Sequence, residues 1–139
     1  MGVYQVWDTS MALTRYQKFA KTALDLAAAS KYEVAHQLCA LVVNKNYVLG
    51  IGYNQPKTHP MSAGTPRDHL HAEMHALLRC ESSNGADMIV VRSKPSGKPG
   101  LAKPCEVCER ILRQFGIRRV FYTVNCETPD DIQLEEMKL

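Results

Sequence analysis

Two short segments of the chain carry side chains that could hold a metal ion and move a proton. His71 offers an imidazole nitrogen, and Glu73 offers a carboxylate two residues later. Further along, Cys105 and Cys108 offer two thiols at positions i and i+3. One nitrogen and two thiolates suit a catalytic zinc that keeps its fourth position for water. We therefore predict zinc ligands at His71, Cys105 and Cys108, with Glu73 as the proton carrier.

Helix starts explain how these side chains could meet. Pro104 is preset for a helix entry, so a helix that begins near Cys105 would hold Cys105 and Cys108 on one face, one turn apart. The free N–H groups and the positive end of the helix dipole would favour thiolates there. His71 stands where a second helical pattern begins. The metal is thus expected between two helix N-termini, with Glu73 projecting towards it.

Each segment alone has ordinary interpretations. A single Cys-x-x-Cys can be a redox pair, half of a structural zinc site or two unrelated core cysteines. A single His-Ala-Glu occurs readily by chance. Both segments in this order, each opening an amphipathic helix, instead favour the zinc site of a base deaminase.

The composition limits the class of protein. The chain has 139 residues, which predicts one domain over residues 1–139. Hydrophobic residues make up 45% and charged residues 22%, as is typical of soluble globular proteins. The net charge of +3 is compatible with a substrate that carries phosphate, but most polynucleotide-binding domains are more basic.

The cysteine count and the absence of apolar runs bear on location. Five cysteines, two of them assigned to the metal, do not form an evident disulfide framework. We expect a reducing cytoplasm, the host cytoplasm if the protein is viral. No signal-peptide pattern begins the chain and no apolar run approaches the ~20 residues of a membrane span, so we expect no membrane association.

Periodicity predicts an α/β fold. The order helix, hairpin, helix, strand, helix, strand favours a three-layer α/β/α arrangement, with a mixed sheet of about four to five strands and helices on both faces. Two long loops and a tail that could be helix or strand complete the chain. The predicted helices are 10–30, 70–82 and 105–115; the strands are 38–43, 47–53, 88–91 and 119–123; the loops are 54–68 and 93–103; and the tail is 130–139.

From about residue 10 to residue 125, these segments resemble the cytidine and deoxycytidylate deaminase superfamily. The resemblance implies a cytidine-deaminase-like fold, Zn²⁺, and hydrolytic conversion of a cytosine nucleoside or nucleotide to its uracil form with release of ammonia. It also implies that the Ala72 N–H holds the carbonyl or developing oxyanion and that Asn54, after Gly52-Tyr53, binds the sugar or base. Lys57, His59 and the lysines of the 93–103 loop are candidates for contacting a phosphate.

The chain also departs from the family pattern. In many relatives Pro-Cys-x-x-Cys follows almost directly on a strand, whereas here residues 93–103 intervene. The extra helix and fifth strand of many relatives are expected to be shortened or missing. Several segments are most similar to small deaminase-like proteins of phages and large DNA viruses. Residues 71–77 also resemble the riboflavin-pathway deaminases, which space their cysteines more widely.

Three alternatives stay open at this point. A deaminase of single-stranded DNA or RNA, acting on cytosine or on tRNA adenosine, would need salt-sensitive binding and aromatic stacking surfaces, with Trp7, Tyr53 and Tyr122 as candidates. An inactive deaminase fold would use zinc structurally, although the intact Glu73 favours an enzyme. A homo-oligomer is also possible, because superfamily members often assemble.

Overall fold

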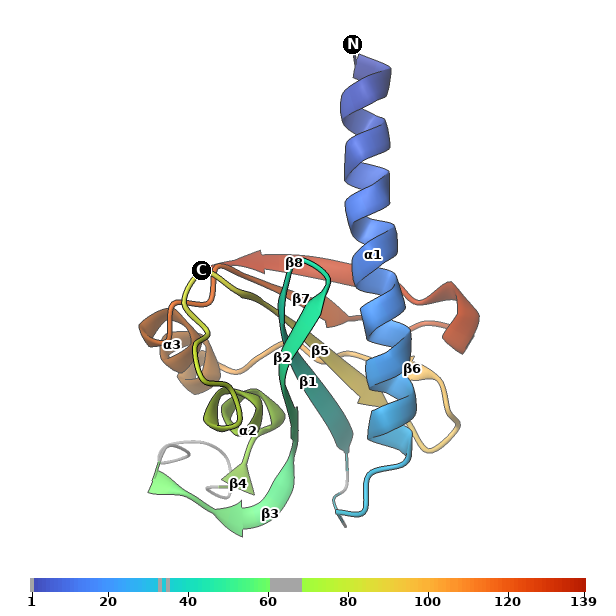
Figure 1. Ribbon diagram of the computed structural model, residues 1–139. Coiled ribbons are helices and arrows are strands. Elements are labelled where there is room, and N and C mark those ends of the chain that lie inside the picture. Colours follow the sequence, from blue (N-terminus) through green and yellow to red (C-terminus); the bar gives the residue numbers. More distant parts are fainter. Residues whose placement is uncertain (1, 33, 35, 61–68) are drawn as a thin grey trace.

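A mixed β-sheet forms the centre of the protein. The computed structural model describes residues 2–32, 34, 36–60 and 69–139 (Figure 1). The strand order of the main sheet is β2-β1-β5-β7-β8, and the short strand β6 pairs with β5. These strands are β1 (Gln37–Asn44), β2 (Tyr47–Tyr53), β5 (Asp87–Ser93), β6 (Pro99–Gly100), β7 (Arg119–Thr123) and β8 (Leu134–Lys138).

The first two strands form the predicted hairpin. β1 is a run of apolar residues that is buried from Cys39 to Val43, as expected for a strand covered on both faces. Lys45 adopts a positive φ of 56° in the tight turn before β2. β1 then also pairs antiparallel with β5, so it lies inside the sheet while β2 forms an edge.

Helices cover both faces of the sheet, which confirms the three-layer prediction. Helix α1 (Gly2–Ala28) packs on β1 and β5, whereas α2 (Ala72–Leu78) and α3 (Glu106–Gln114) lie on the opposite face (Figure 1). The alternation of side chains along β1 divides the core accordingly: Leu41 faces the α1 layer and Ala40 the α2 and α3 layer. α3 connects β5 to the parallel strand β7, as the crossover rule predicts.

The first helix is longer than its predicted range of 10–30. It begins at Gly2, because residues 3–9 contain neither proline nor glycine that would delay its start. Among the side chains described from Arg15 onwards, the buried stripe includes Tyr16, Ala20 and Ala27. The N-terminal half of α1 accordingly projects past the sheet (Figure 1).

Three segments predicted as loop or tail contain strands. Within the predicted loop 54–68, β3 (Gln55–Thr58) pairs with β4 (His69–Leu70), and residues 61–68 lie outside the described part of the chain. The segment 93–103 contains β6. The tail forms β8, which pairs antiparallel with β7 and supplies the strand that was expected to be shortened or missing.

The second helix is shorter than predicted. It spans Ala72–Leu78 and not residues 70–82, because Leu70 belongs to β4 and Arg79 already leaves helical geometry with φ −96° and ψ 7°. Across the described residues, no helix combines the length and hydropathy needed to span a membrane.

Candidate metal centre and active site

The start of α2 presents His71 and Glu73 together. His71 is the N-cap residue, with extended backbone angles of φ −78° and ψ 155°, and its side chain makes no capping hydrogen bond. Its carbonyl accepts the first helical bond from the His75 N–H at 3.0 Å. The imidazole is therefore available for another partner, and Glu73 follows in the first turn as predicted.

The start of α3 presents the two cysteines in the same way. Cys105 is the N-cap residue, extended at φ −74° and ψ 168°, and it too makes no side-chain cap. Cys108 lies one turn later and is fully buried. The helix ends as predicted, since Gly116 takes the positive φ of 79° that is typical of a C′ residue.

The three side chains form one cluster. His71 Nδ1 lies 3.2 Å from Cys108 Sγ and 3.8 Å from Cys105 Sγ, and all three ligand atoms lie within 4.8 Å of one another. Ordinary zinc bond lengths with tetrahedral angles place a nitrogen and a sulfur ligand about 3.6 Å apart. The donor types and their spacing therefore both fit a tetrahedral Zn²⁺ with three protein ligands. Among the described residues, no fourth ligand group joins the cluster.

Protons shared within the cluster alter the acidity of all three ligands. A hydrogen bond from Cys108 lowers the pKa of Cys105 to about 4. The same bond, together with burial, raises the pKa of Cys108. The hydrogen bond with Cys105 also raises the pKa of His71. These are protons that a bound metal displaces, so zinc affinity at this site must fall at low pH.

Glu73 is a buried acid beside this cluster. It is only 4% exposed, and burial raises the pKa of its carboxyl group above the ordinary range. Cys108 lies within hydrogen-bonding reach of the carboxylate. No Lys or Arg of the described chain forms an ion pair with Glu73, so its proton affinity is not suppressed by a fixed cation. Such an environment suits proton transfer.

Two glycines of β2 allow α2 to approach the sheet closely. A Cβ at Gly52 would overlap the backbone of Ala72 and Ala76, and a Cβ at Gly50 would lie 2.6 Å from the Ala76 carbonyl oxygen. The close packing of α2 on β2 therefore requires positions without a side chain. Ala72 itself is fully buried at the first position of α2.

The predicted substrate contacts lie on different elements of the fold. Asn54 follows β2, and its side chain binds the chain entering β1: Oδ1 accepts from the Leu38 N–H at 2.9 Å, and Nδ2 donates to the His36 carbonyl. His59 follows β3 and is half-buried. The roles of Asn54, Ala72 and His59 towards a substrate stay predictions.

His75 is a positioning residue that the motif search did not single out. Its Nδ1 lies 2.9 Å from both the Tyr53 N–H nitrogen and Gln55 Nε2, which ties α2 to the end of β2. Burial and the nearby Arg79 and Lys57 lower the pKa of His75, so the ring stays a neutral acceptor. The spacing of one helical turn from His71 was the available sequence signal.

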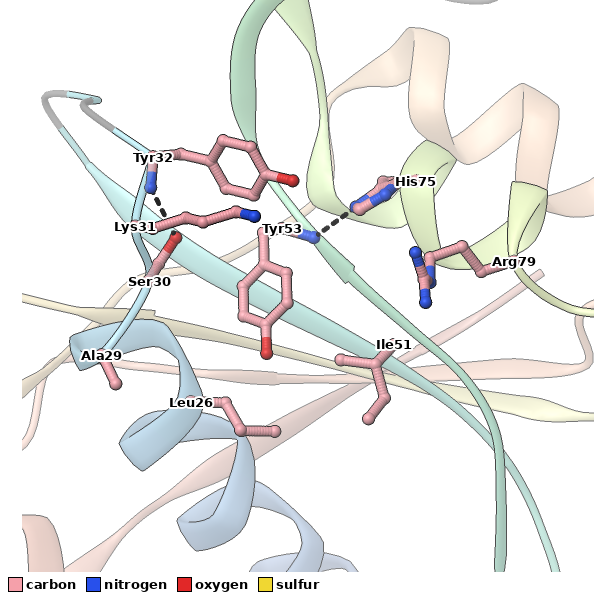
Figure 2. A pocket seen from close by; sticks show the side chains of 9 residues that line it. All are labelled: Leu26, Ala29, Ser30, Lys31, Tyr32, Ile51, Tyr53, His75 and Arg79. Carbon is pink, nitrogen blue, oxygen red and sulfur yellow. Dashed lines mark hydrogen bonds between the residues drawn. The ribbon is translucent and has the colours of Figure 1, made fainter.

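A pocket of about 440 Å³ is lined by His75, by Tyr53 of β2 and by residues at the C-terminal end of α1 (Figure 2). Tyr32 and Tyr53 stand close together there, with ring centroids 6.2 Å apart. Tyr53, proposed for base stacking, therefore lines this pocket, which contains none of the metal ligands. Tyr122 is 6% exposed and donates to Glu135 at 2.9 Å, so it presents no free ring face, while the Trp7 side chain lies outside the described part.

Comparison with known proteins places the chain in a family. Residues 13–124 match the family model for the cytidine and deoxycytidylate deaminase zinc-binding region. The chain belongs to the cytidine and deoxycytidylate deaminase family. Its cofactor is Zn²⁺, since the matched region contains the histidine and both cysteines of the cluster. This deaminase is thus a hydrolytic enzyme by family. A search of curated proteins found no match.

Solved structures support the same fold for this deaminase. The dCMP deaminase of cyanophage S-TIM5, crystallised with dCMP and dUMP, superposes with a TM-score of 0.56 at 23% identity, covering 81% of this chain and 83% of that one. RibD of Acinetobacter baumannii gives a TM-score of 0.55 at 21% identity over 81% of this chain and 29% of its own. At these identities the likeness concerns the fold.

Proposed function

We propose that this enzyme removes the amino group of cytosine in a free nucleoside or nucleotide. The products are the uracil form of the same compound and ammonia. The observation that supports this most directly is a buried carboxylate, Glu73, which pairs with no Lys or Arg of the described chain and lies beside a cluster of three zinc-ligand side chains. A structural zinc site is normally closed by four protein ligands and has no need of a proton carrier.

Bound zinc supplies one chemical effect, which is to lower the pKa of water from 15.7 towards about 7. Glu73 accepts the proton of the attacking water as the water oxygen bonds to C4 of the base. Glu73 passes this proton to the ring nitrogen N3. It then takes the second proton from the new C4 hydroxyl and delivers it to the amino group, whose bond to C4 breaks as ammonia leaves and the C4 carbonyl forms. Its raised pKa matches both halves of this task.

Backbone and side-chain groups around Glu73 would orient the base. The first N–H groups of α2 have no helical acceptor, so the Ala72 N–H can hold the base carbonyl. Asn54 uses one amide hydrogen and one oxygen lone pair on the His36–Leu38 backbone. It retains a second hydrogen and a second lone pair for a sugar or base.

Ammonia release from a panel of compounds tests this function. The panel contains cytidine, deoxycytidine, dCMP, dCTP, adenosine, guanine and single-stranded oligonucleotides. Turnover of a free cytosine compound by zinc-loaded protein is expected. Turnover of oligonucleotides alone would replace the proposal with a polynucleotide deaminase, and no turnover of any compound by zinc-loaded, folded protein would favour a binding role.

A further inference from the structure

Arg92 lies on the same face of the sheet as α2 and α3, the two helices that begin at the metal cluster. Along β5, Met88 and Val90 pack against the α2 and α3 layer, and Arg92 is the next residue in that alternation. It pairs with Leu38 of β1, whose side chain packs against the same cluster. Arg92 therefore lies at the end of the sheet where β5 finishes, next to the last residue of that strand.

Within the described residues, the polar contacts of Arg92 include no acidic partner. Nη2 lies 2.9 Å from His36 Nδ1, and the buried Nε has no hydrogen-bond partner among those residues. Across the described chain, no carboxylate lies within 4 Å of this guanidinium, whereas both Arg118 and Arg119 pair with Asp87. A half-buried arginine without an acid is costly unless an anionic ligand completes it.

The contact with Arg92 determines which tautomer of the His36 ring is present. Arginine can only donate, so His36 Nδ1 must be the acceptor and the ring proton must be on Nε2. Lys94 follows Arg92 on the same face, and both stems pass over Gly100, since a Cβ there would lie 3.1 Å from carbons of each. Two cations and one imidazole N–H donor therefore gather in one place.

A continuous set of contacts joins this group to the catalytic residues. Gly52 touches the backbone of Ala72, which follows the ligand His71. Asn54, the residue that follows β2, binds the backbone of His36 and Leu38. His36 in turn contacts Arg92. A substrate that reaches from Glu73 past Asn54 would extend towards the guanidinium.

We propose that Arg92, aided by His36 and Lys94, binds the phosphate of the substrate, so that the enzyme acts on a nucleotide in preference to a nucleoside. This inference rests on the proposed deamination of a cytosine compound. Arginine suits the role because its planar fork matches phosphate oxygens in a bidentate manner. The assignment keeps Lys94, one of the loop lysines that the sequence offered for a phosphate, and adds Arg92 and His36. It differs from the other candidates Lys57 and His59, which lie along β3 and after it.

Binding to zinc-loaded protein that cannot turn over tests the proposal without relying on catalysis. In a Glu73→Gln background, calorimetry would compare dCMP with deoxycytidine before and after Arg92→Ala. We expect dCMP to bind about 10- to 100-fold more weakly after the substitution, with deoxycytidine changed less than twofold. Equal weakening of both ligands, or no initial preference for dCMP, would overturn the proposal.

Two further variants keep the test sharp. Arg113→Ala is the matched control, because Arg113 is an exposed arginine that pairs with Glu109 at 3.0 Å, and dCMP binding should be unchanged. Arg92→Lys keeps a charge without the fork and should lose less affinity than Arg92→Ala. Circular dichroism of each variant establishes folding; if Arg92→Ala is unfolded, the Arg92→Lys comparison decides, and unchanged dCMP affinity there overturns the proposal.

The source of the phosphate is tested with a single-stranded oligonucleotide that contains one cytosine. If Arg92→Ala weakens only the oligonucleotide and not dCMP, the phosphate recognised is that of a polynucleotide and the proposal is wrong. Failure of the deaminase function is distinguishable, because wild-type protein would then release no ammonia from dCMP while still binding it through Arg92.

Discussion

Two buried carboxylates on the same small domain have opposite surroundings. Glu73 and Asp87 are each 4% exposed. Asp87 accepts hydrogen bonds from Tyr16 at 2.6 Å, from Arg119 at 3.0 Å and from Arg118 at 3.2 Å. Burial raises the pKa of Asp87, but these donors outweigh it and leave the pKa below its ordinary value. At Glu73 burial prevails and the pKa is raised.

The difference shows how neighbours decide what a buried acid does. Asp87 is fixed as a charged acceptor that joins α1, β5 and β7, so its role is stability. Glu73 lacks a fixed cation and lies beside a metal cluster, so it can gain and lose a proton. Separate substitutions should therefore affect turnover at one acid and folding at the other.

The largest expected effect is on turnover. Glu73→Ala should lower kcat by about 10²- to 10⁴-fold, because a positioned proton carrier contributes that much to such reactions. Zinc content and the unfolding midpoint should stay near those of the wild type. Ammonia release and elemental analysis measure both quantities, with Glu81→Ala at an exposed site as the control. Wild-type turnover by Glu73→Ala would contradict the mechanism.

The next effect concerns the metal. Purified wild-type protein should hold about one zinc per chain, and Cys108→Ser should lose most of it, because the hydroxyl group is a poor substitute for a thiolate ligand. Cys39→Ser is the matched control: this buried thiol lies outside the cluster, and burial raises its pKa to about 12. Elemental analysis decides, and a folded wild-type protein without metal would refute the ligand assignment.

Asp87 should govern stability instead. Asp87→Ala removes the only carboxylate that the described chain pairs with Arg118 and Arg119, and we expect a loss of about 3–5 kcal/mol in the free energy of unfolding. Asp130→Ala removes the exposed bridge to Lys21 and should cost under about 1 kcal/mol. Urea titration of both variants compares them, and equal losses would show that burial does not distinguish the two pairs.

The smallest effect is a pH dependence of that stability. Because the folded pKa of Asp87 is lowered, its contribution is present above the unfolded value of about 3.9 and is lost as the pH falls through the folded pKa. The stability difference between wild type and Asp87→Asn should therefore shrink as the pH is lowered from about 5 to 3. Urea midpoints across this range measure it; a constant difference would remove Asp87 from the acid response.

The clustering of His71, Cys105 and Cys108 was predictable because its signals are local. Pro104-Cys105 and His71 mark helix starts, and the i, i+3 spacing fixes the relation between the cysteines. The strands β6 and β8 were not predictable, since β6 has only two residues and β8 is partly exposed along its length. Their conformation depends on pairing with β5 and β7, which sequence periodicity does not report.

Arg92 shows a further limit of sequence reasoning. From the sequence alone, an arginine at the end of an apolar strand is predicted to be exposed to solvent and without a specific role. Its significance depends on which face of the sheet it shares and on a histidine, His36, that lies far away in sequence. The buried network around Asp87 was likewise invisible, because Tyr16 and Arg119 come from opposite ends of the chain.

Residues 94–98 form the turn of the β5–β6 hairpin, in which β6 folds back and pairs with the end of β5. Ser93 pairs with Pro99, the turn closes with the Lys94 N–H on the Lys98 carbonyl at 2.9 Å, and Thr123 Oγ1 then donates to the Gly100 carbonyl. The Ala102 N–H bonds the Thr123 carbonyl at 2.9 Å, so the path into the cysteine helix is anchored to β7. The turn between Lys94 and Lys98 can therefore change in length or composition without displacing the Cys105 and Cys108 thiols. Related enzymes could differ in sequence at this turn and keep the same metal site.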